Sequence, residues 1–281
     1  MNTDQLKDLL RRYRLKPNFT YGQNFLLDEI VLTDMADAAA LSPGGAVLEI
    51  GPGIGNLTRL LLQRAGFVLA VEKDPKFLPI LKAIRKDFPK KFYFEIADIL
   101  EYDFQKFFQE KGFESYSVAA NIPYYITGKI LKMLMAARFK PQMITLLTQK
   151  EVAGNVCAKA GDLSVLAISV QLFAEPKILQ IVPARSFYPA PKVDSAVLQI
   201  APYETPRYKL EDEKKFFRLL KACFAGKRKQ IHNTLSGNLG LDKNLAQRVL
   251  EQTKIAPQAR PQELTIEQWI MLAENVERIN K

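Results

Sequence analysis

Between residues 46 and 200, short apolar runs alternate with longer segments in which apolar residues recur at helical spacing. A continuous apolar run is typical of a strand buried on both faces, whereas the longer segments are typical of amphipathic helices. This order predicts an α/β fold with a parallel sheet that helices cover on both faces. The predicted strands are 46–50, 67–71, 93–96, 117–120, 143–147 and an antiparallel pair, 178–182 and 196–200, and the predicted helices are 4–14, 28–40, 56–64, 75–85 and 127–138.

The pattern changes after Ala201-Pro202-Tyr203. No strand pattern remains beyond this point, and apolar residues at helical spacing indicate a small all-α region. We therefore expect two domains, residues 1–201 and residues 202–281. The helices predicted for the second domain are 211–225, 227–238, 242–252 and 265–278.

The turn between the first buried strand and its helix is rich in glycine. The segment Glu49–Thr58 contains Gly51, Gly53 and Gly55, and glycine lets the backbone approach a ligand at a helix N-terminus. A dinucleotide-binding fingerprint has its third glycine one position later, where this chain has Asn56. G-x-G-x-G after an acidic residue is instead the pattern of Rossmann-like methyltransferases. The motif predicts S-adenosyl-L-methionine as cofactor and S-adenosyl-L-homocysteine as product.

Two carboxylates follow the next two predicted strands. Glu72 ends the second strand about 20 residues after the glycine turn, where an acidic residue holds ribose hydroxyls. Asp98 ends the third strand and can accept a hydrogen bond from an adenine amino group. Either carboxylate alone is more often a helix cap or a surface charge. Because the carboxyl ends of parallel strands meet at one edge of a sheet, we expect both to converge with the glycine turn on one cofactor site.

The fourth predicted strand ends in Asn121-Ile122-Pro123-Tyr124, which suits methylation of an exocyclic amine on a flat base. Such an amine is a poor nucleophile because its lone pair is delocalised into the ring. The Asn121 side-chain oxygen and the Ile122 carbonyl can each accept one amine hydrogen, and Pro123 fixes the backbone. Tyr124 offers a face on which a base can stack. A lone four-residue match would equally fit a strand followed by a turn, so the neighbouring cofactor motif is what favours catalysis.

Composition narrows the chemistry. One histidine and two cysteines are too few for a zinc site or a histidine base, so no metal is expected.

The net charge of +10 fits a solvated surface or a polyanionic partner, and the interleaving of basic and aromatic residues favours unstacked nucleic acid. We expect a cytoplasmic protein, because no apolar run spans a membrane and no signal-peptide pattern is visible. The residues expected to bind RNA are Arg11, Arg12, Lys227, Arg228 and Lys229.

With these motifs the chain resembles the KsgA/RsmA family of ribosomal RNA adenine dimethyltransferases over nearly its whole length. The resemblance rests on residues 22–26, 49–58, 72–74, 98, 121–124, 149–153, 163–165 and 187–195. It implies a Rossmann-like methyltransferase domain followed by a small helical domain that binds rRNA. It also implies dimethylation of N6 of two adjacent adenosines near the 3′ end of 16S rRNA, within an immature small ribosomal subunit.

The resemblance further implies roles for single residues. Asn121 and Tyr124 would receive the target base, and Phe187 would press on it from the other side, although a core aromatic residue before a proline turn fits Phe187 nearly as well. The chain departs from the family at Ala97, at Ala190, at Gly154-Asn155 and in a shortened segment, 156–163, which bears on RNA contact. The residues implied in methyl-donor binding are Gln23, Asn24, Leu26, Gly51, Gly53, Glu72, Asp98 and Asn121.

Other functions share part of this pattern. An Erm-type methyltransferase that acts on 23S rRNA also has Asn-Ile-Pro-Tyr, but residues 187–195 and the helical tail favour the small-subunit enzyme. An assembly checkpoint factor, for which binding matters more than methylation, is the alternative from another class. A mitochondrial homologue is disfavoured by the absence of a clean transit peptide, and a DNA adenine methyltransferase by the absence of a visible target-recognition domain. A monomer is expected.

Overall fold

The computed structural model describes residues 1–18, 22–39, 44–226 and 228–279, which form two compact units. The first unit consists of Met1–Ala153 and Ala174–Pro202, and the second of Gly154–Phe173 and Tyr203–Lys281. The segment 154–173 was predicted to lie in the first domain. It groups with the second unit because its apolar residues, among them Ala167 and Ile168, are part of that unit's core.

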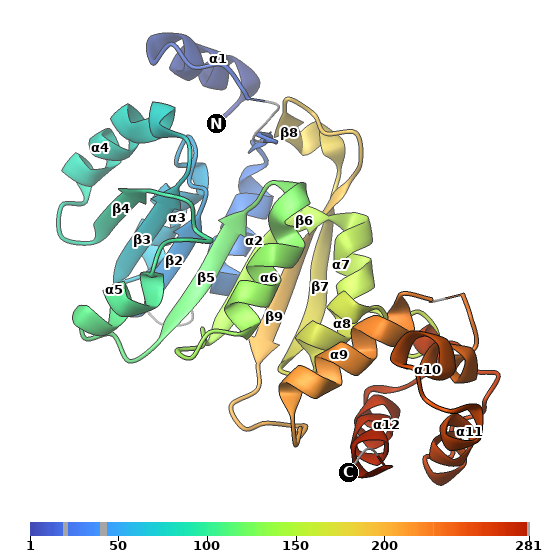
Figure 1. Ribbon diagram of the computed structural model, residues 1–281. Helices are drawn as coiled ribbons and strands as arrows, with labels where there is room; N and C mark the ends of the chain where they lie inside the picture. The colour runs from blue at the N-terminus through green and yellow to red at the C-terminus, as the bar shows by residue number, and fades with distance from the viewer. Residues whose placement is uncertain (19–21, 40–43, 227, 280–281) are drawn as a thin grey trace. The chain divides into compact units, whose positions relative to one another are not determined.

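The first unit is built on a seven-stranded sheet with the order β4-β3-β2-β5-β6-β9-β7 (Figure 1). The strands from β4 to β6 in this order run parallel, and β9 is antiparallel to both β6 and β7. The predicted α/β fold, including its antiparallel pair, is confirmed. The strands are β2 (Ala46–Ile50), β3 (Phe67–Glu72), β4 (Phe92–Ile96), β5 (Tyr116–Asn121), β6 (Met143–Gln149), β7 (Ala174–Val182) and β9 (Ser195–Pro202).

Burial explains why apolar runs occupy the centre of the sheet. Every residue of β2 is buried, and β5 is buried up to Asn121 at its end. Strands of this kind lie between two layers of helices, and Figure 1 shows α6 in front of the sheet and α2 behind it. The helices are α1 (Thr3–Arg12), α2 (Glu29–Ala39), α3 (Asn56–Arg64), α4 (Leu78–Asp87), α5 (Phe104–Glu110), α6 (Thr127–Met135) and α7 (Lys150–Val156), with the short 3-10 helices η2 (Pro75–Phe77), η3 (Tyr124–Ile126) and η4 (Ala184–Ser186).

A two-stranded ribbon holds the segment that precedes α2. In it, β1 (Phe25–Leu26) pairs antiparallel with β8 (Phe187–Tyr188), so that Leu26 lies opposite Phe187. The backbone N–H of Leu27 donates to the carbonyl of Ser186 at 2.9 Å and extends the pairing. Since both Leu26 and Phe187 are buried in the core of the unit, the ribbon gives this segment one fixed position.

The second unit is all-helical, as predicted. Its helices pack around Trp269, which is fully buried and stacks on Phe224. The helix predicted from residue 227 begins at Ile231 instead, because Gln230 is extended. No helix in the described parts of the chain is long and apolar enough to cross a membrane. The helices are α8 (Val165–Gln171), α9 (Glu213–Phe224), α10 (Ile231–Leu239), α11 (Lys243–Gln252) and α12 (Ile266–Ile279), with η5 (Pro261–Glu263).

Candidate active site

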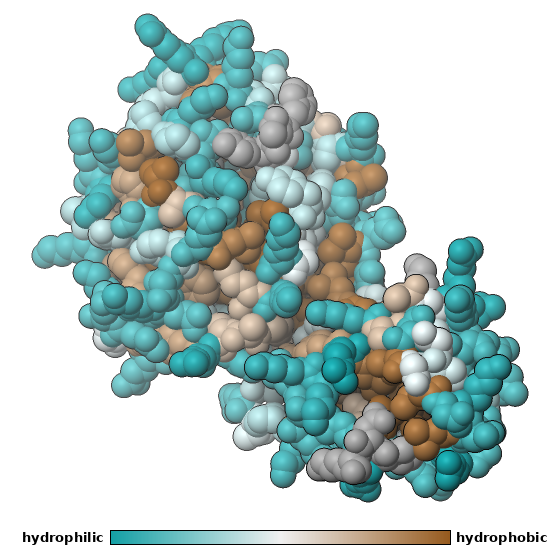
Figure 2. Space-filling model, in the orientation of Figure 1, coloured by the Kyte–Doolittle hydropathy of each residue, from teal (hydrophilic) through white to brown (hydrophobic). Residues whose placement is uncertain are grey.

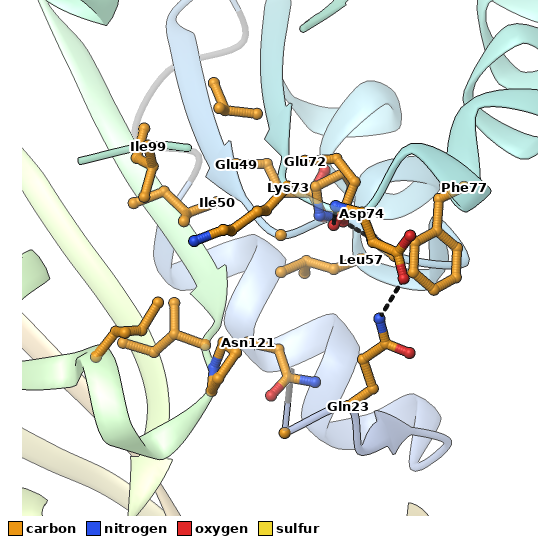
Figure 3. A pocket seen from close by; sticks show the side chains of 18 of the residues that line it. Gln23, Glu49, Ile50, Leu57, Glu72, Lys73, Asp74, Phe77, Ile99 and Asn121 are labelled. Carbon is orange, nitrogen blue, oxygen red and sulfur yellow. Dashed lines mark hydrogen bonds between the residues drawn. The ribbon is translucent and has the colours of Figure 1, made fainter. Parts of the chain in front are cut away.

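A cavity of about 260 Å³ opens at the carboxyl ends of β2, β3 and β5. Its walls come from the segment 22–26, from the turns that follow these strands, and from residues 97–100 after β4 (Figure 3). This is the edge of the sheet at which open α/β folds bind ligands. Every residue expected to bind the methyl donor lines the cavity, namely Gln23, Asn24, Leu26, Gly51, Gly53, Glu72, Asp98 and Asn121.

The turn after β2 requires glycine. Gly51, Gly53 and Gly55 have φ angles of +70°, +53° and +79°, which residues with a side chain rarely adopt. A Cβ at Gly55 would overlap the side chain of Ile84 on α4, whereas the nearest described neighbour of a Cβ at Gly51 would be the carbonyl oxygen of Asn121, at 4.0 Å. Gly55 therefore permits close packing of α4, and Gly51 leaves space in the cavity.

Two buried acids face the cavity from β2 and β3 (Figure 3). The Oε2 atom of Glu72 accepts a hydrogen bond from the Gly53 N–H at 3.0 Å, and its Oε1 atom accepts one from the Asp74 N–H at 2.8 Å. Burial raises the pKa of Glu72, and these backbone donors oppose the rise. Glu49 is only 1% exposed, and its Oε2 atom has no hydrogen-bond donor among the described residues. Burial raises the pKa of Glu49 to about 8.

Asp98 is the more exposed carboxylate of the cavity. Its Oδ2 atom accepts a hydrogen bond from the Lys73 ammonium at 2.7 Å, and its Oδ1 atom accepts one from the Leu100 N–H at 3.0 Å. The hydrogen bond from Lys73 lowers the pKa of Asp98, so the carboxylate is ionised at neutral pH. The pair joins the carboxyl ends of β3 and β4. Lys73 belongs to the motif 72–74, but the sequence predicted no role for it.

The N-terminal segment is fastened to the cavity rim by side-chain amides. The Gln23 Nε2 atom donates to Asp74 at 3.1 Å, while the Gln23 Oε1 atom accepts from the Asn18 N–H at 2.8 Å. Asn56, at the position where a dinucleotide fingerprint has glycine, donates from Nδ2 to the Leu26 carbonyl at 3.0 Å. These bonds close the cavity on the side of β1.

Asn121 ends β5 with its side chain in the cavity (Figure 3). Its Nδ2 atom donates to the backbone carbonyl of Asn24 at 3.1 Å, and the Asn24 side chain in turn donates to the Gly22 carbonyl at 3.3 Å. Because a carbonyl can only accept, this bond fixes which end of the Asn121 amide is the nitrogen. The Oδ1 atom, which has no donor within the described parts of the chain, remains an available acceptor.

The two aromatic residues expected to hold the target base differ in position. Tyr124 lines the cavity, and its hydroxyl shares a hydrogen bond of 2.7 Å with Ser195 on β9. Burial raises the pKa of this hydroxyl. Phe187 is 5% exposed and packs in the core beside Leu26, without lining the cavity. The structure therefore brings Tyr124, but not Phe187, to the cavity wall.

Four of the basic residues expected to bind RNA, Arg11, Arg12, Arg228 and Lys229, are described by the structure and lie outside the cavity lining. Arg11, on α1, forms an ion pair with Asp8 at 3.3 Å, and the Arg12 guanidinium lies over the ring of Tyr13. In the second unit Arg228 and Lys229 are exposed between α9 and α10. Lys227 lies outside the described residues.

Two further residues that the sequence motifs did not assign line the cavity. Tyr125 follows Tyr124 directly, and Lys129 lies in the first turn of α6. An aromatic residue next to Tyr124 is a sequence signal that could have identified the first. Nothing in the local sequence distinguishes Lys129 from the exposed Lys132 on the same helix.

The sheet order and the cavity at its strand ends define a Rossmann-like methyltransferase. Solved structures of such enzymes are similar to the chain. A dimethyladenosine transferase from Plasmodium falciparum matches with a TM-score of 0.78 and 25% identity, over 91% of this chain and 98% of that one. The 23S rRNA methyltransferase ErmE matches with a TM-score of 0.69 and 27% identity, over 90% of this chain and 100% of that one.

Residues 14–277 match the family model described as ribosomal RNA adenine dimethylase, and the chain belongs to this family. A ribosomal RNA small subunit methyltransferase A from Alkaliphilus oremlandii is 38% identical over 276 residues, which are 96% of this chain and 95% of that protein. The resemblance found in the motifs is thereby confirmed, and the chain is an rRNA adenine dimethyltransferase.

Proposed function

We propose that this enzyme transfers methyl groups from S-adenosyl-L-methionine to N6 of two adjacent adenosines near the 3′ end of 16S rRNA, in an immature small ribosomal subunit. The observation that carries the proposal is the convergence of Glu72, Asp98 and Asn121 with Tyr124 on one cavity. The first two residues suit a nucleoside, and the last two suit the amine and the ring of a target base. We further propose that the enzyme acts as a monomer in the cytoplasm.

The cavity lining fits a cationic methyl donor. Acidic side chains at two strand ends, Glu72 and Asp98, face the cavity. Glu72 would hold the ribose hydroxyls with lone pairs that its two backbone donors do not use, and Asp98 would accept from the adenine amino group. Gly51 and Gly53 leave space for the amino-acid portion of the donor. Around them Gln23, Asn24 and Leu26 would close the site over it.

When bound, the donor supplies a methyl group that is activated by a positive sulfur atom. The chain's own residues make the adenine amine nucleophilic and orient it. In the first transfer Asn121 Oδ1 would accept one amine hydrogen and the Ile122 carbonyl the other, which localises the lone pair on nitrogen. In the second transfer one hydrogen is left to accept. Each transfer breaks the sulfur–methyl bond, leaves S-adenosyl-L-homocysteine and releases one proton from the nitrogen. Pro123, with φ of −56°, fixes that carbonyl. Tyr124 supplies a stacking face, and Phe187, which pairs with Leu26 and packs in the core, would hold this wall of the site in place. Orientation and electrostatic stabilisation of this kind account for much of an enzyme's rate.

A base cannot react within a helical stack, so the target adenosine must be flipped out or already unpaired. The protein's positive charge suits the RNA backbone around it. We assign RNA contacts to Arg11 and Arg12 in the first unit and to Lys227, Arg228 and Lys229 in the second. The first unit is then the catalytic domain, and the second is an rRNA-binding domain.

The test uses small and large ribosomal subunits from cells that lack this enzyme and Erm activity. Each is incubated with the full chain and isotope-labelled methyl donor, and the modified nucleosides are identified by mass spectrometry. We expect N6,N6-dimethyladenosine at two adjacent positions near the 3′ end of 16S rRNA. Label in 23S rRNA alone would favour the ErmE-like alternative, and no label in either RNA would contradict the proposal.

A further inference from the structure

An aromatic side chain is exposed at the mouth of the cavity. Tyr125 lines the cavity and is nevertheless 61% exposed, whereas the preceding residue, Tyr124, is half-buried. The ring lies beside Gly22, where an added Cβ would come within 3.7 Å of the Tyr125 Cε1 atom. Its hydroxyl has no hydrogen-bond partner in the described parts of the chain. Core packing and internal hydrogen bonding therefore do not explain why an aromatic ring occupies this exposed position.

A cation stands one helical turn further on. Lys129 is exposed, lines the same cavity and follows Tyr125 by four residues across the start of α6. Within the described residues no carboxylate lies at ion-pair distance from Lys129, in contrast to Lys73, which pairs with Asp98. Leu100, 37% exposed, is a further apolar group of the lining. The mouth of the cavity thus presents an aromatic face and a positive charge to solvent.

An aromatic face next to a cation is the combination with which proteins bind single-stranded nucleic acid. When the target base leaves its stack, the neighbouring base loses a stacking partner. A ring at the cavity mouth can replace that partner, and an ammonium close by can neutralise the adjoining phosphate.

We infer that Tyr125 and Lys129 bind the nucleotide next to the target adenosine, with the Tyr125 ring stacked on its base and the Lys129 ammonium on its phosphate. This inference rests on the proposed function, because it requires an RNA substrate whose target base enters the cavity. It assigns these two residues to substrate positioning, while donor binding stays with the residues deeper in the cavity.

The first test compares Tyr125→Ala with Tyr125→Phe on small subunits from cells that lack the enzyme. Loss of one base–aromatic stack corresponds to roughly a 5- to 150-fold loss of affinity. We therefore expect Tyr125→Ala to raise KM for the subunits at least about 5-fold with a smaller effect on kcat, and Tyr125→Phe, which keeps the ring, to retain the wild-type KM. Ile30→Ala, which trims a 73% exposed side chain on α2 outside the cavity, is the matched control.

The second test compares Lys129→Ala with Lys132→Ala, an exposed lysine on the same helix that does not line the cavity. If Lys129 neutralises a phosphate, its loss should reduce the slope of log affinity against log salt by about 0.7 to 0.9. Removal of the Lys132 ammonium group in Lys132→Ala should leave the slope unchanged. Binding of unmethylated small subunits is measured at several salt concentrations.

Three results would overturn the inference. These are an unchanged KM in Tyr125→Ala, a rise in KM in Tyr125→Phe as large as that in Tyr125→Ala, and equal salt slopes in the two lysine variants. Donor affinity measured by calorimetry should match the wild type in Tyr125→Ala, and its loss in that variant would move Tyr125 into the donor site instead. Failure of the proposed function is distinct, since the wild-type enzyme itself would then leave 16S rRNA unmethylated.

Discussion

The side-chain nitrogen of Asn121 donates a hydrogen bond to the backbone oxygen of Asn24, 97 residues earlier in the chain, at 3.1 Å. This bond joins the end of β5 to the N-terminal segment and turns the amide so that its oxygen is left for another donor. The orientation is thus set by the fold before any base enters, which is the preorganisation that electrostatic catalysis requires.

Replacing Asn121 should reduce methyl transfer far more than it weakens donor binding. Asn121→Ala removes the amine acceptor, and removal of one such preorganised group costs about 100- to 1000-fold in kcat. Asn121→Asp should be as damaging, because a carboxylate oxygen would then face the Asn24 carbonyl. Rates on small subunits are compared with donor affinity from calorimetry, which we expect to change by less than about 10-fold.

The same variant separates catalysis from an assembly role. If binding of Asn121→Ala to immature subunits is retained while methylation is lost, the two roles can be studied apart in cells. Wild-type methylation by Asn121→Ala would rule out the assignment of Asn121 as the amine acceptor.

Glu72→Ala should abolish measurable donor binding. The carboxylate is held in place by two backbone N–H groups, at 3.0 and 2.8 Å from its oxygens. Its removal takes away the acceptor proposed for the ribose and leaves the Gly53 and Asp74 donors unpaired, at a cost of about 1–3 kcal/mol in stability. Calorimetry and thermal unfolding measure the two effects. Glu101→Ala, which removes an exposed carboxylate outside the cavity, is the control, and donor affinity retained in Glu72→Ala would refute the cofactor assignment.

The central strands of the sheet could be predicted because each is a continuous apolar run. Strands β2, β3, β5 and β6 lie close to their predicted bounds for this reason. The edge strand β7 begins earlier than predicted, since its first residues include Pro176 and Lys177 and it pairs on one side only. The two-residue strands β1 and β8 have no period of their own and exist through contacts between distant segments.

In the cavity, the sequence predicted those residues whose side-chain direction follows from their position at a strand end alone. Glu72 and Asn121 end parallel strands and Asp98 follows one, and the carboxyl ends of these strands share one edge of the sheet. The direction of the Phe187 side chain depends on its pairing with Leu26, and the pairing of Lys73 with Asp98 depends on two strand ends. Such relationships arise in the tertiary structure and leave no local pattern.

Neutralising the basic residues before α10 should weaken RNA binding and flatten its salt dependence. Arg228→Gln with Lys229→Gln removes two exposed charges, and the slope of log affinity against log salt should fall by about 1.4 to 1.8. Lys227→Gln should add a further reduction of about 0.7 to 0.9. Binding of unmethylated small subunits is measured from low to physiological salt.

The matched control for these charges is Lys106→Gln with Lys111→Gln, at α5 and just after it, where no RNA contact is proposed. Its slope should equal that of the wild type. An unchanged slope in the Arg228 and Lys229 variant would place the RNA surface elsewhere, with Arg11 and Arg12 on α1 next to be tested.

Glu49→Gln should make the protein more stable at alkaline pH. Burial raises the pKa of Glu49 from 4.5 to about 8, and the neighbouring Glu72 carboxylate adds to the rise. The folded state therefore keeps a proton that the unfolded chain loses above pH 4.5, so this group's contribution to stability falls as pH rises to about 8 and is constant beyond. Glutamine has nearly the same shape and no proton to lose. The difference in free energy of unfolding between Glu49→Gln and wild type should grow between pH 5 and 8, by an amount on the order of a few kcal/mol. Thermal unfolding at several pH values measures this difference. A difference independent of pH would show that Glu49 is ionised in the folded protein.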